Sequence, residues 1–369
     1  MGGDNASDIA ALCLSAGGKF SSAGELFVGP ATAGIDFPYL DKAMAAGILG
    51  GLGAVSVHPY RATPPDTALD DYVRLRALIE KYGATPTQRS MPILSGEWGY
   101  TTATLPCMYG NRCDELTQAA YLARMWLTNT LAGTTISINY DWSDGNGGLA
   151  DCESHFGSVR QPPTGNPTTP YTPKPKYMAA LALQTGLGSF QRFSQRVAPL
   201  SVAPASVPAG NVFILEFANG TGGPGQVVGY AAWTNGSNTR GACSPPGHPS
   251  PPGWRRLDCG HWGISRADCV SATNPKGPGC CWEPNVTVVG GPQCYKAELP
   301  VVTAVNITFS AAPGVQHAHD EKSACWATVD VLGRSLATVC ADATGVVAVA
   351  VPVLPNATEN APVYLLPVQ

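Results

Sequence analysis

Apolar and polar positions along the chain follow two different patterns, and the change falls near residue 195. Before it, short apolar runs alternate with longer amphipathic segments. We expect strands at 25–31, 54–58, 92–95 and 134–140, and helices at 37–49, 68–82, 114–131 and 176–187. Within 68–82, Tyr72, Leu75, Ile79 and Tyr82 recur at helical spacing, and Asp114 suits a helix N-cap. Strands alternating with helices predict a parallel α/β sheet, doubly wound or closed into a barrel.

After residue 195 the apolar runs are short and separated by Gly, Asn and Pro. They lie at 211–217, 226–233, 302–309, 326–331, 346–351 and 363–366, the pattern of an antiparallel β-sandwich. A cysteine-rich block at 241–296 interrupts them as an inserted module. We therefore divide the chain into 1–192, a sandwich of 193–240 with 297–369, and the insert. No G-x-G-x-x-G follows a strand, which disfavours a dinucleotide fold.

Composition excludes several classes of function. Only 13% of the 369 residues are charged and the net charge is −4, whereas nucleic-acid binding needs a concentrated basic face. No apolar run approaches the roughly 20 residues that span a bilayer. The sequence points to no cofactor and no metal site, because no C-x-x-C pair occurs.

Cysteines and sequons point to the secretory pathway. Six of the 12 cysteines crowd between Cys243 and Cys294, which predicts disulfides and an oxidising compartment. Outside this block we predict Cys107–Cys113 and Cys325–Cys340, and Cys13 paired with Cys152 or with a segment absent from this chain. Five of the six N-x-S/T sequons follow residue 210, which suits a glycoprotein. The residues after Met1 do not resemble a signal peptide.

Three of the predicted strands end in polar or aromatic residues that a plain core would not need. Glu97 is the most informative, because a carboxylate at a strand end among aromatic side chains suits the nucleophile of a retaining glycosidase; the alternative is a solvated loop glutamate. His58 contacts the substrate or orients Glu97; the alternative is a structural histidine that caps its strand. Sugar-stacking faces are expected from Tyr60, Trp98, Tyr100, Tyr140 and Trp142. Asp141 and Asp144 bind sugar hydroxyls or form a turn.

Seven segments together resemble the second half of clan A glycoside hydrolases with a family 39-like or cellulase-like barrel. They are LFVGPATAG, VSVHPYR, PILSGEWGY, DELTQAAYLARMWL, INYDW, ESHFG and KPKYMAALAL. The resemblance implies strands 5–8 of a (β/α)8 TIM barrel, Glu97 as the nucleophile and a carbohydrate substrate. The family's acid/base is a Glu that follows Asn at the end of strand 4, and no Asn-Glu pair occurs here.

Retaining hydrolysis needs two carboxylates about 5–5.5 Å apart, and only one is identifiable in the sequence. Residues 5–23 resemble the helix that follows strand 4. We therefore expect a truncated chain, in which the export signal, strands 1–4 and the acid/base belong to a missing upstream part.

The cysteine-rich block resembles the P-type (trefoil) domain through RLDCG, GI, GCCW and CY in order. The resemblance implies the disulfides Cys243–Cys281, Cys259–Cys280 and Cys269–Cys294, and a glycan cleft lined by Trp282 and Tyr295. Gln293 stands where that family usually has Trp, so a stabilised spacer is the alternative to a glycan-binding module.

These observations predict a secreted retaining glycoside hydrolase that acts on a polysaccharide or glycoconjugate through Glu97. The first alternative is a non-catalytic secreted glycan-binding protein, which would not need a second carboxylate. The second is a purely structural extracellular protein, which would bind no sugar.

Overall fold

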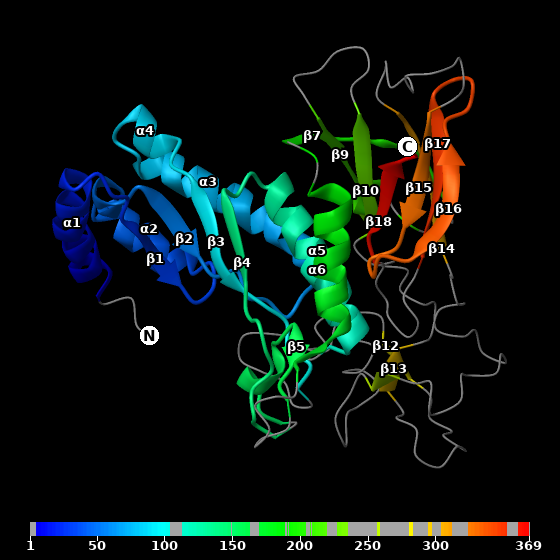
Figure 1. Ribbon diagram of the computed structural model, residues 1–369. Helices are drawn as coiled ribbons and strands as arrows, with labels where there is room; N and C mark the ends of the chain where they lie inside the picture. The colour runs from blue at the N-terminus through cyan, green and yellow to red at the C-terminus, as the bar shows by residue number, and fades with distance from the viewer. Residues whose placement is uncertain are drawn as a thin grey trace.

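A computed structural model of the chain describes two regions of regular structure joined by two helices (Figure 1). The described residues are 5–103, 113–148, 150–162, 170–188, 190, 192–203, 207, 209–219, 227–234, 304–311, 324–352 and 361–368, with the backbone of 257–258, 280–282 and 294–296.

The N-terminal region contains a four-stranded, fully parallel sheet in the order β1-β2-β3-β4. Its strands are β1 (Val28–Thr32), β2 (Ala54–Val57), β3 (Ile93–Trp98) and β4 (Ile136–Asn139). The helices around it are α1 (Ala6–Ser22), α2 (Phe37–Ala45), α3 (Ala68–Tyr82), α4 (Pro86–Arg89), α5 (Glu115–Leu131) and α6 (Pro175–Leu187), with 3-10 turns η2 (Ile48–Gly51) and η3 (Pro65–Thr67). The predicted alternation of strands and helices is confirmed. Because all four strands run in the same direction, their carboxyl ends meet at one edge of the sheet.

Local sequence explains where the long helices begin and end. Helix α3 buries Tyr72, Leu75 and Ile79 on one face and has the predicted bounds. Helix α5 begins where predicted, because the Asp114 carboxylate accepts the Thr117 amide at 2.7 Å. The helix expected at 37–49 stops early, at Ala45, because Gly47 adopts a left-handed φ of 86° before η2.

The C-terminal region contains two antiparallel sheets that share a core. The larger has the order β16-β15-β18-β10-β9-β7 and the smaller β17-β14-β8. Ile214 and Trp326 of the larger sheet pack against Ile307, Phe309 and Val349 of the smaller. The strands are β7 (Arg192–Arg196), β8 (Pro199–Ala203), β9 (Val212–Ala218), β10 (Val228–Thr234), β14 (Ala304–Ser310), β15 (Cys325–Val329), β16 (Ser335–Cys340), β17 (Val346–Pro352) and β18 (Val363–Pro367), with η5 (Ala209–Asn211) before β9.

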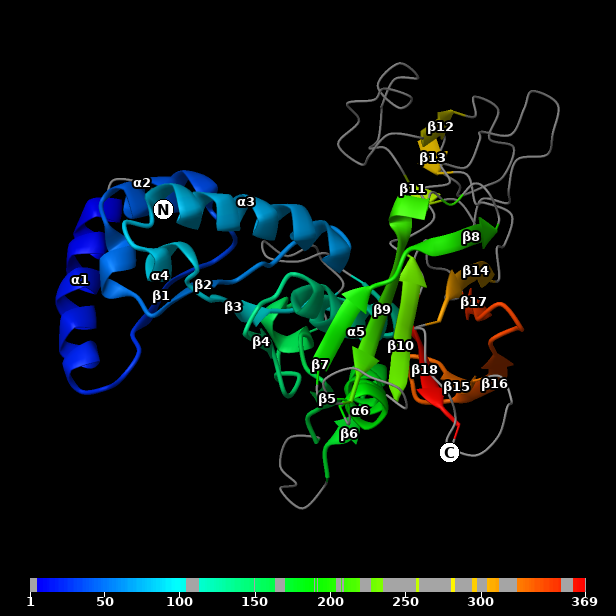
Figure 2. The ribbon, with the colours of Figure 1, turned by 90° about the horizontal axis from the view of Figure 1, so that it is seen from above.

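Helices α5 and α6 lie between the parallel sheet and the larger antiparallel sheet in both views (Figures 1 and 2). Leu127 of α5 and Leu187 of α6 belong to one buried cluster with Phe213, Trp233 and Tyr364 of that sheet. Burial of large aromatic side chains at this contact ties the two regions together.

Three short strands lie in the predicted insert between β10 and β14. They are β11 (Leu257–Asp258), β12 (Cys280–Trp282) and β13 (Cys294–Lys296), in the antiparallel order β11-β13-β12. The side chains of Trp282 and Tyr295 and the three disulfides predicted for this module lie outside the described residues, so those assignments stay predictions.

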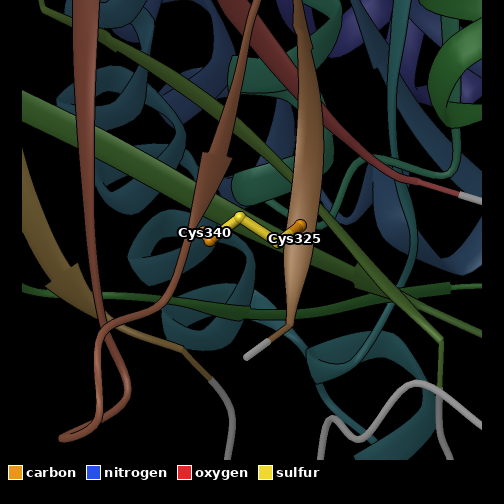
Figure 3. Close-up of a disulfide and its surroundings, with 2 residues drawn as sticks. All are labelled: Cys325 and Cys340. Atoms are coloured by element: carbon orange, nitrogen blue, oxygen red, sulfur yellow. A yellow bond between two sulfur atoms is a disulfide. The ribbon is translucent and has the colours of Figure 1, made fainter. Parts of the chain in front are cut away.

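One disulfide prediction is confirmed, and one of the two alternatives predicted for Cys13 is wrong. Cys325 and Cys340 face each other across β15 and β16 and are bonded (Figure 3). Cys13 of α1 is a thiol buried in the core of the N-terminal region. Cys152 is disulfide-bonded, so these two residues do not pair. Cys113 Sγ lies 3.5 Å from the backbone oxygen of Thr101, and Cys107 lies outside the described residues, so the Cys107–Cys113 bond stays a prediction.

No helix within the described ranges is long and apolar enough to cross a membrane.

Candidate active site

The carboxyl ends of β2, β3 and β4 bring the candidate residues to one edge of the sheet. His58 follows β2 directly, Glu97 is the fifth residue of β3, and Tyr140 follows β4. The sequence prediction that these strand ends share one site depends on parallel pairing, and that pairing is present. Active sites of parallel α/β sheets form at this edge.

The Glu97 carboxylate accepts a hydrogen bond from one neighbour, lies close to a second and still reaches solvent. Its Oε1 accepts a hydrogen bond of 2.6 Å from the Tyr60 hydroxyl, and its Oε2 lies 4.0 Å from His58 Nδ1. The Glu97 side chain is 38% exposed and that of His58 is 21% exposed. A fixed, accessible carboxylate is the geometry that a nucleophile requires.

Tyr60 is a hydrogen-bond donor to Glu97 and not a competing anion. Burial raises the pKa of Tyr60, and its hydrogen bond to the Glu97 carboxylate raises that pKa further. The Tyr60 ring packs edge-on against Phe156 at 6.0 Å between ring centroids, and Tyr140 contacts Phe156 at 5.4 Å. Phe156 is therefore the common support of the two tyrosines.

Glycine beside Glu97 allows β2 and β3 to approach closely. A Cβ on Gly96 would lie 2.3 Å from Ser56 Oγ and 3.4 Å from the His58 ring. The space beside Gly96 is therefore occupied by side chains of the protein itself.

Two of the aromatic residues expected to bind sugar are buried instead. Trp98 is 1% exposed, donates from Nε1 to Ser137 Oγ and packs against Trp126, because it points to the helix-covered face of the sheet. Tyr100 is 3% exposed and donates to the backbone oxygen of Thr63. Both side chains support the site from behind, and their assignment as substrate contacts is wrong.

Trp142 and Tyr140 remain accessible after β4. Trp142 is 60% exposed and contacts Tyr177 of α6 edge-on at 6.2 Å, and Tyr140 is half-buried. Asp144 is engaged within the protein, since its Oδ1 accepts from Lys174 Nζ at 3.0 Å and the Gly157 amide at 2.9 Å. These bonds favour its structural role over sugar binding.

The surroundings of Asp141 bear on its two predicted roles, sugar binding and turn formation. Burial raises the pKa of its carboxyl, while the nearby Lys176 opposes that rise. Its Oδ1 is buried without a hydrogen-bond partner in the described part of the chain.

Three residues near this edge, Phe156, Lys176 and Glu153, were not singled out from the sequence. They lie in or beside a segment formed by η4 (Glu153–His155), β5 (Val159–Arg160) and β6 (Thr172–Pro173). Lys176 donates to the backbone oxygens of Phe156 at 2.5 Å and Tyr140 at 3.4 Å. Burial is the main reason that the pKa of Tyr140 is raised, and the carboxylates of Asp141, Glu153 and Glu97 add to it. A phenylalanine, a lysine at the start of a helix and a glutamate in a short 3-10 turn carry no sequence signal for a role in supporting an active site.

Within the described ranges, no three His, Cys, Asp or Glu side chains gather closely enough to hold a metal ion.

Residues 249–297 match the family model of the trefoil (P-type) domain and form such a domain. The match begins after Cys243, so it does not cover the first cysteine of the implied pairing. The trefoil domain and the Cys325–Cys340 disulfide are consistent with an extracellular protein. No curated protein matches the chain in sequence.

The fold is similar to those of glycoside hydrolases. A family 39 glycoside hydrolase from the gut symbiont Bacteroides cellulosilyticus WH2 matches 90% of this chain with a TM-score of 0.50 and 16% identity, and the chain covers 48% of that structure. Weaker likenesses are a 4-O-α-L-rhamnosyl-β-D-glucuronidase from Fusarium oxysporum 12S (8% identity, 92% of this chain and 58% of that one, TM-score 0.40) and a glucosidase from Croceicoccus marinus (10%, 94% and 60%, 0.45).

The chain is thus a mixed α/β protein with β-sheet domains, one of them a trefoil domain, and its structural neighbours are glycoside hydrolases. The chain spans about half the length of the family 39 structure that it matches.

Proposed function

We propose that the chain is part of a retaining glycoside hydrolase that attacks a carbohydrate substrate through Glu97. The observation that carries the proposal is the Glu97 carboxylate, which is exposed at the carboxyl edge of a parallel sheet, hydrogen-bonded by Tyr60 and close to His58. In this mechanism Glu97 attacks the anomeric carbon and forms a glycosyl-enzyme, which water then hydrolyses. Tyr140 and Trp142 offer accessible aromatic faces at the same edge.

In this proposal residues 1–192 are strands 5–8 of a (β/α)8 barrel, and an upstream part supplies strands 1–4, an export signal and the acid/base carboxylate. Physical support comes from the edge strands. In the described part of the chain β1 and β4 each pair with one strand only, and Ile136 and Ile138 of β4 are 47% and 51% exposed. Parallel sheets are normally covered on both faces, and an unpaired edge strand leaves backbone groups unbonded. Both the exposed isoleucines and the open edge of β4 therefore call for further strands.

In the proposed mechanism the nucleophile and the acid/base are different residues, so attack by Glu97 can be tested without the acid/base. Dinitrophenyl glycosides with fluorine beside the anomeric carbon have a leaving group that needs no protonation, so Glu97 can be glycosylated without the acid/base. We would incubate the chain with a panel of such sugars and locate the adduct by mass spectrometry. Labelling of the peptide that contains Glu97 is expected, and Glu97→Gln should abolish it.

Glu80→Gln is the matched control, because Glu80 is an exposed glutamate on α3. Labelling that persists in Glu97→Gln would refute the nucleophile assignment. No labelling by any sugar, together with retention of the chain on immobilised glycans, would favour the alternative of a non-catalytic glycan-binding protein, for which the trefoil domain is the specific support. If the chain is neither labelled by any sugar nor retained on glycans, the result would favour a structural protein.

A further inference from the structure

A buried polar cluster connects the candidate active-site loop to the antiparallel sheets. The loop of residues 58–67 leaves β2, carries His58 and Tyr60, and ends in η3, where Asp66 is only 4% exposed. Asp66 Oδ1 accepts from Trp233 Nε1 of β10 at 2.5 Å, and its Oδ2 pairs with Arg124 of α5. Three elements distant in sequence therefore meet at one carboxylate.

The ion pair is fully enclosed, with side-chain exposures of 0% for both Asp66 and Arg124. A buried charge is tolerated only when its partners are in place, and loss of one donor is costly. Trp233 is itself completely buried and stacks on Phe213 at 5.0 Å, so its indole N–H is fixed by the core of the larger antiparallel sheet. The donor thus cannot follow the loop if the loop moves.

Hydrogen bonds also restrain the loop between Tyr60 and Asp66. Arg61 donates to Thr67 Oγ1 at 3.0 Å and to Asp71 at 3.2 Å, and Tyr100 donates to the Thr63 backbone oxygen at 3.0 Å. A restraint applied at Asp66 is therefore transmitted along the loop to the residues that hold Glu97.

We propose that Asp66 and Trp233 are positioning residues, through which the larger antiparallel sheet holds the His58–Tyr60 loop against Glu97. This inference rests on the proposed function for its catalytic meaning, although the coupling itself is a property of the fold. It gives the antiparallel sheets a task at the active site that goes beyond the role of an accessory domain.

Trp233→Phe tests the coupling in the full chain, because phenylalanine keeps a ring to stack on Phe213 and removes the N–H. The first readout is hydrogen exchange of the His58, Tyr60 and Thr67 amides, which bond to backbone oxygens of Thr32, His58 and Pro64. We expect exchange about tenfold faster, as for a weakened local structure.

The second readout is specific to the site. The Tyr60 hydroxyl proton, assigned by its loss in Tyr60→Phe, is followed by NMR in protein with labelled tyrosine. Its exchange with water should also accelerate about tenfold in Trp233→Phe, because the hydrogen bond to Glu97 opens when the loop moves.

Trp326→Phe is the matched control. Trp326 is 1% exposed and its indole N–H donates to the Val228 backbone oxygen at 3.0 Å, inside the antiparallel region. Equal effects of the two substitutions on the loop, or an unchanged loop in Trp233→Phe, would overturn the inference. Because neither readout needs catalysis, absence of glycosidase activity would refute only the proposed function.

A second pair of variants applies if Trp233→Phe does not fold. Asp66→Asn is compared with Asp330→Asn, since Asp330 is 3% exposed and bonded to Arg334 within the antiparallel region. Faster loop exchange only in Asp66→Asn supports the coupling, and equal exchange in both contradicts it.

Discussion

At the scale of single residues, Lys176 is an unusual element of the site. Burial lowers its pKa from 10.5 to about 7, with a further contribution from the charge of Lys174. Its Nζ donates hydrogen bonds to the backbone oxygens of Phe156 and Tyr140. These bonds fix the position of Phe156, whose ring supports Tyr60. A lysine that binds its proton less readily in the folded state makes stability depend on pH.

The direction of that dependence follows from the two pKa values. Between pH 7 and about pH 10 the unfolded chain binds the Lys176 proton and the folded chain does not, so stability rises with pH across this window. From pH 7 to pH 9 the Lys176 contribution is about 2 kcal/mol. Chemical denaturation at several pH values should show this rise in wild type and in Lys42→Met, an exposed control, and lose it in Lys176→Met. The same change of stability with pH in all three proteins would contradict the assignment to Lys176.

Gly96 provides a second prediction at this scale. Gly96→Ala should destabilise the protein by about 1–3 kcal/mol, because the new methyl group meets the buried Ser56 side chain. Combining it with Ser56→Ala removes the clash and should recover much of the loss. Gly18→Ala is the control, since nothing lies near that position in α1, and should be neutral or slightly stabilising. Thermal unfolding of wild type and these three variants measures the effect. A loss of stability that persists in the double variant would argue against the clash.

At the scale of elements, helix α5 tests the capping argument. Asp114→Ala removes the acceptor of the Thr117 amide and should cost about 1 kcal/mol. Asp114→Asn keeps a side-chain oxygen and should stay within a few tenths of a kcal/mol of wild type. Denaturant unfolding of the two variants would contradict capping if alanine and asparagine proved equally destabilising.

Elements with strong local signals were predictable from the sequence. Helix α3 has a regular apolar face, and α5 has a capping aspartate, so their starts were predicted correctly. Strands β8 and β16 were missed because β8 begins with Pro199 and β16, at the sheet edge, is largely exposed, which hides the alternation that marks a half-buried strand.

The same reasoning explains the site. His58, Tyr60 and Glu97 were found because polar residues at strand ends stand out, and parallel pairing brings them together. Trp98 was misassigned because the register shifts between Ser95 and Trp98, which places this side chain on the helix-covered face. Support from Phe156 and Lys176 depends on tertiary packing, which strand and helix patterns do not encode.

At the scale of the whole molecule, the parallel sheet has two unpaired edges in the described part of the chain. Ile136 and Ile138 of β4 are half exposed, and a depression of about 360 Å³ on helices α5 and α6 is lined by Trp126, Tyr177 and Leu181. Trp126 donates to the backbone oxygen of Ser137 in β4, so the depression adjoins the open edge. An apolar strand edge without a partner is a site for association with other strands.

We therefore predict that the isolated chain self-associates through β4. Replacing both isoleucines, Ile136→Lys with Ile138→Lys, should shift the chain toward the monomer in sedimentation and light scattering, because charged side chains on an edge strand oppose pairing. Val73→Lys is the control, since Val73 is a single apolar residue on α3 and 70% exposed. If Val73→Lys reduced association as strongly as the β4 variant, general charge and not the open edge would explain the effect. If neither did, the edge would be protected in this chain and the argument for missing strands would lose its physical support.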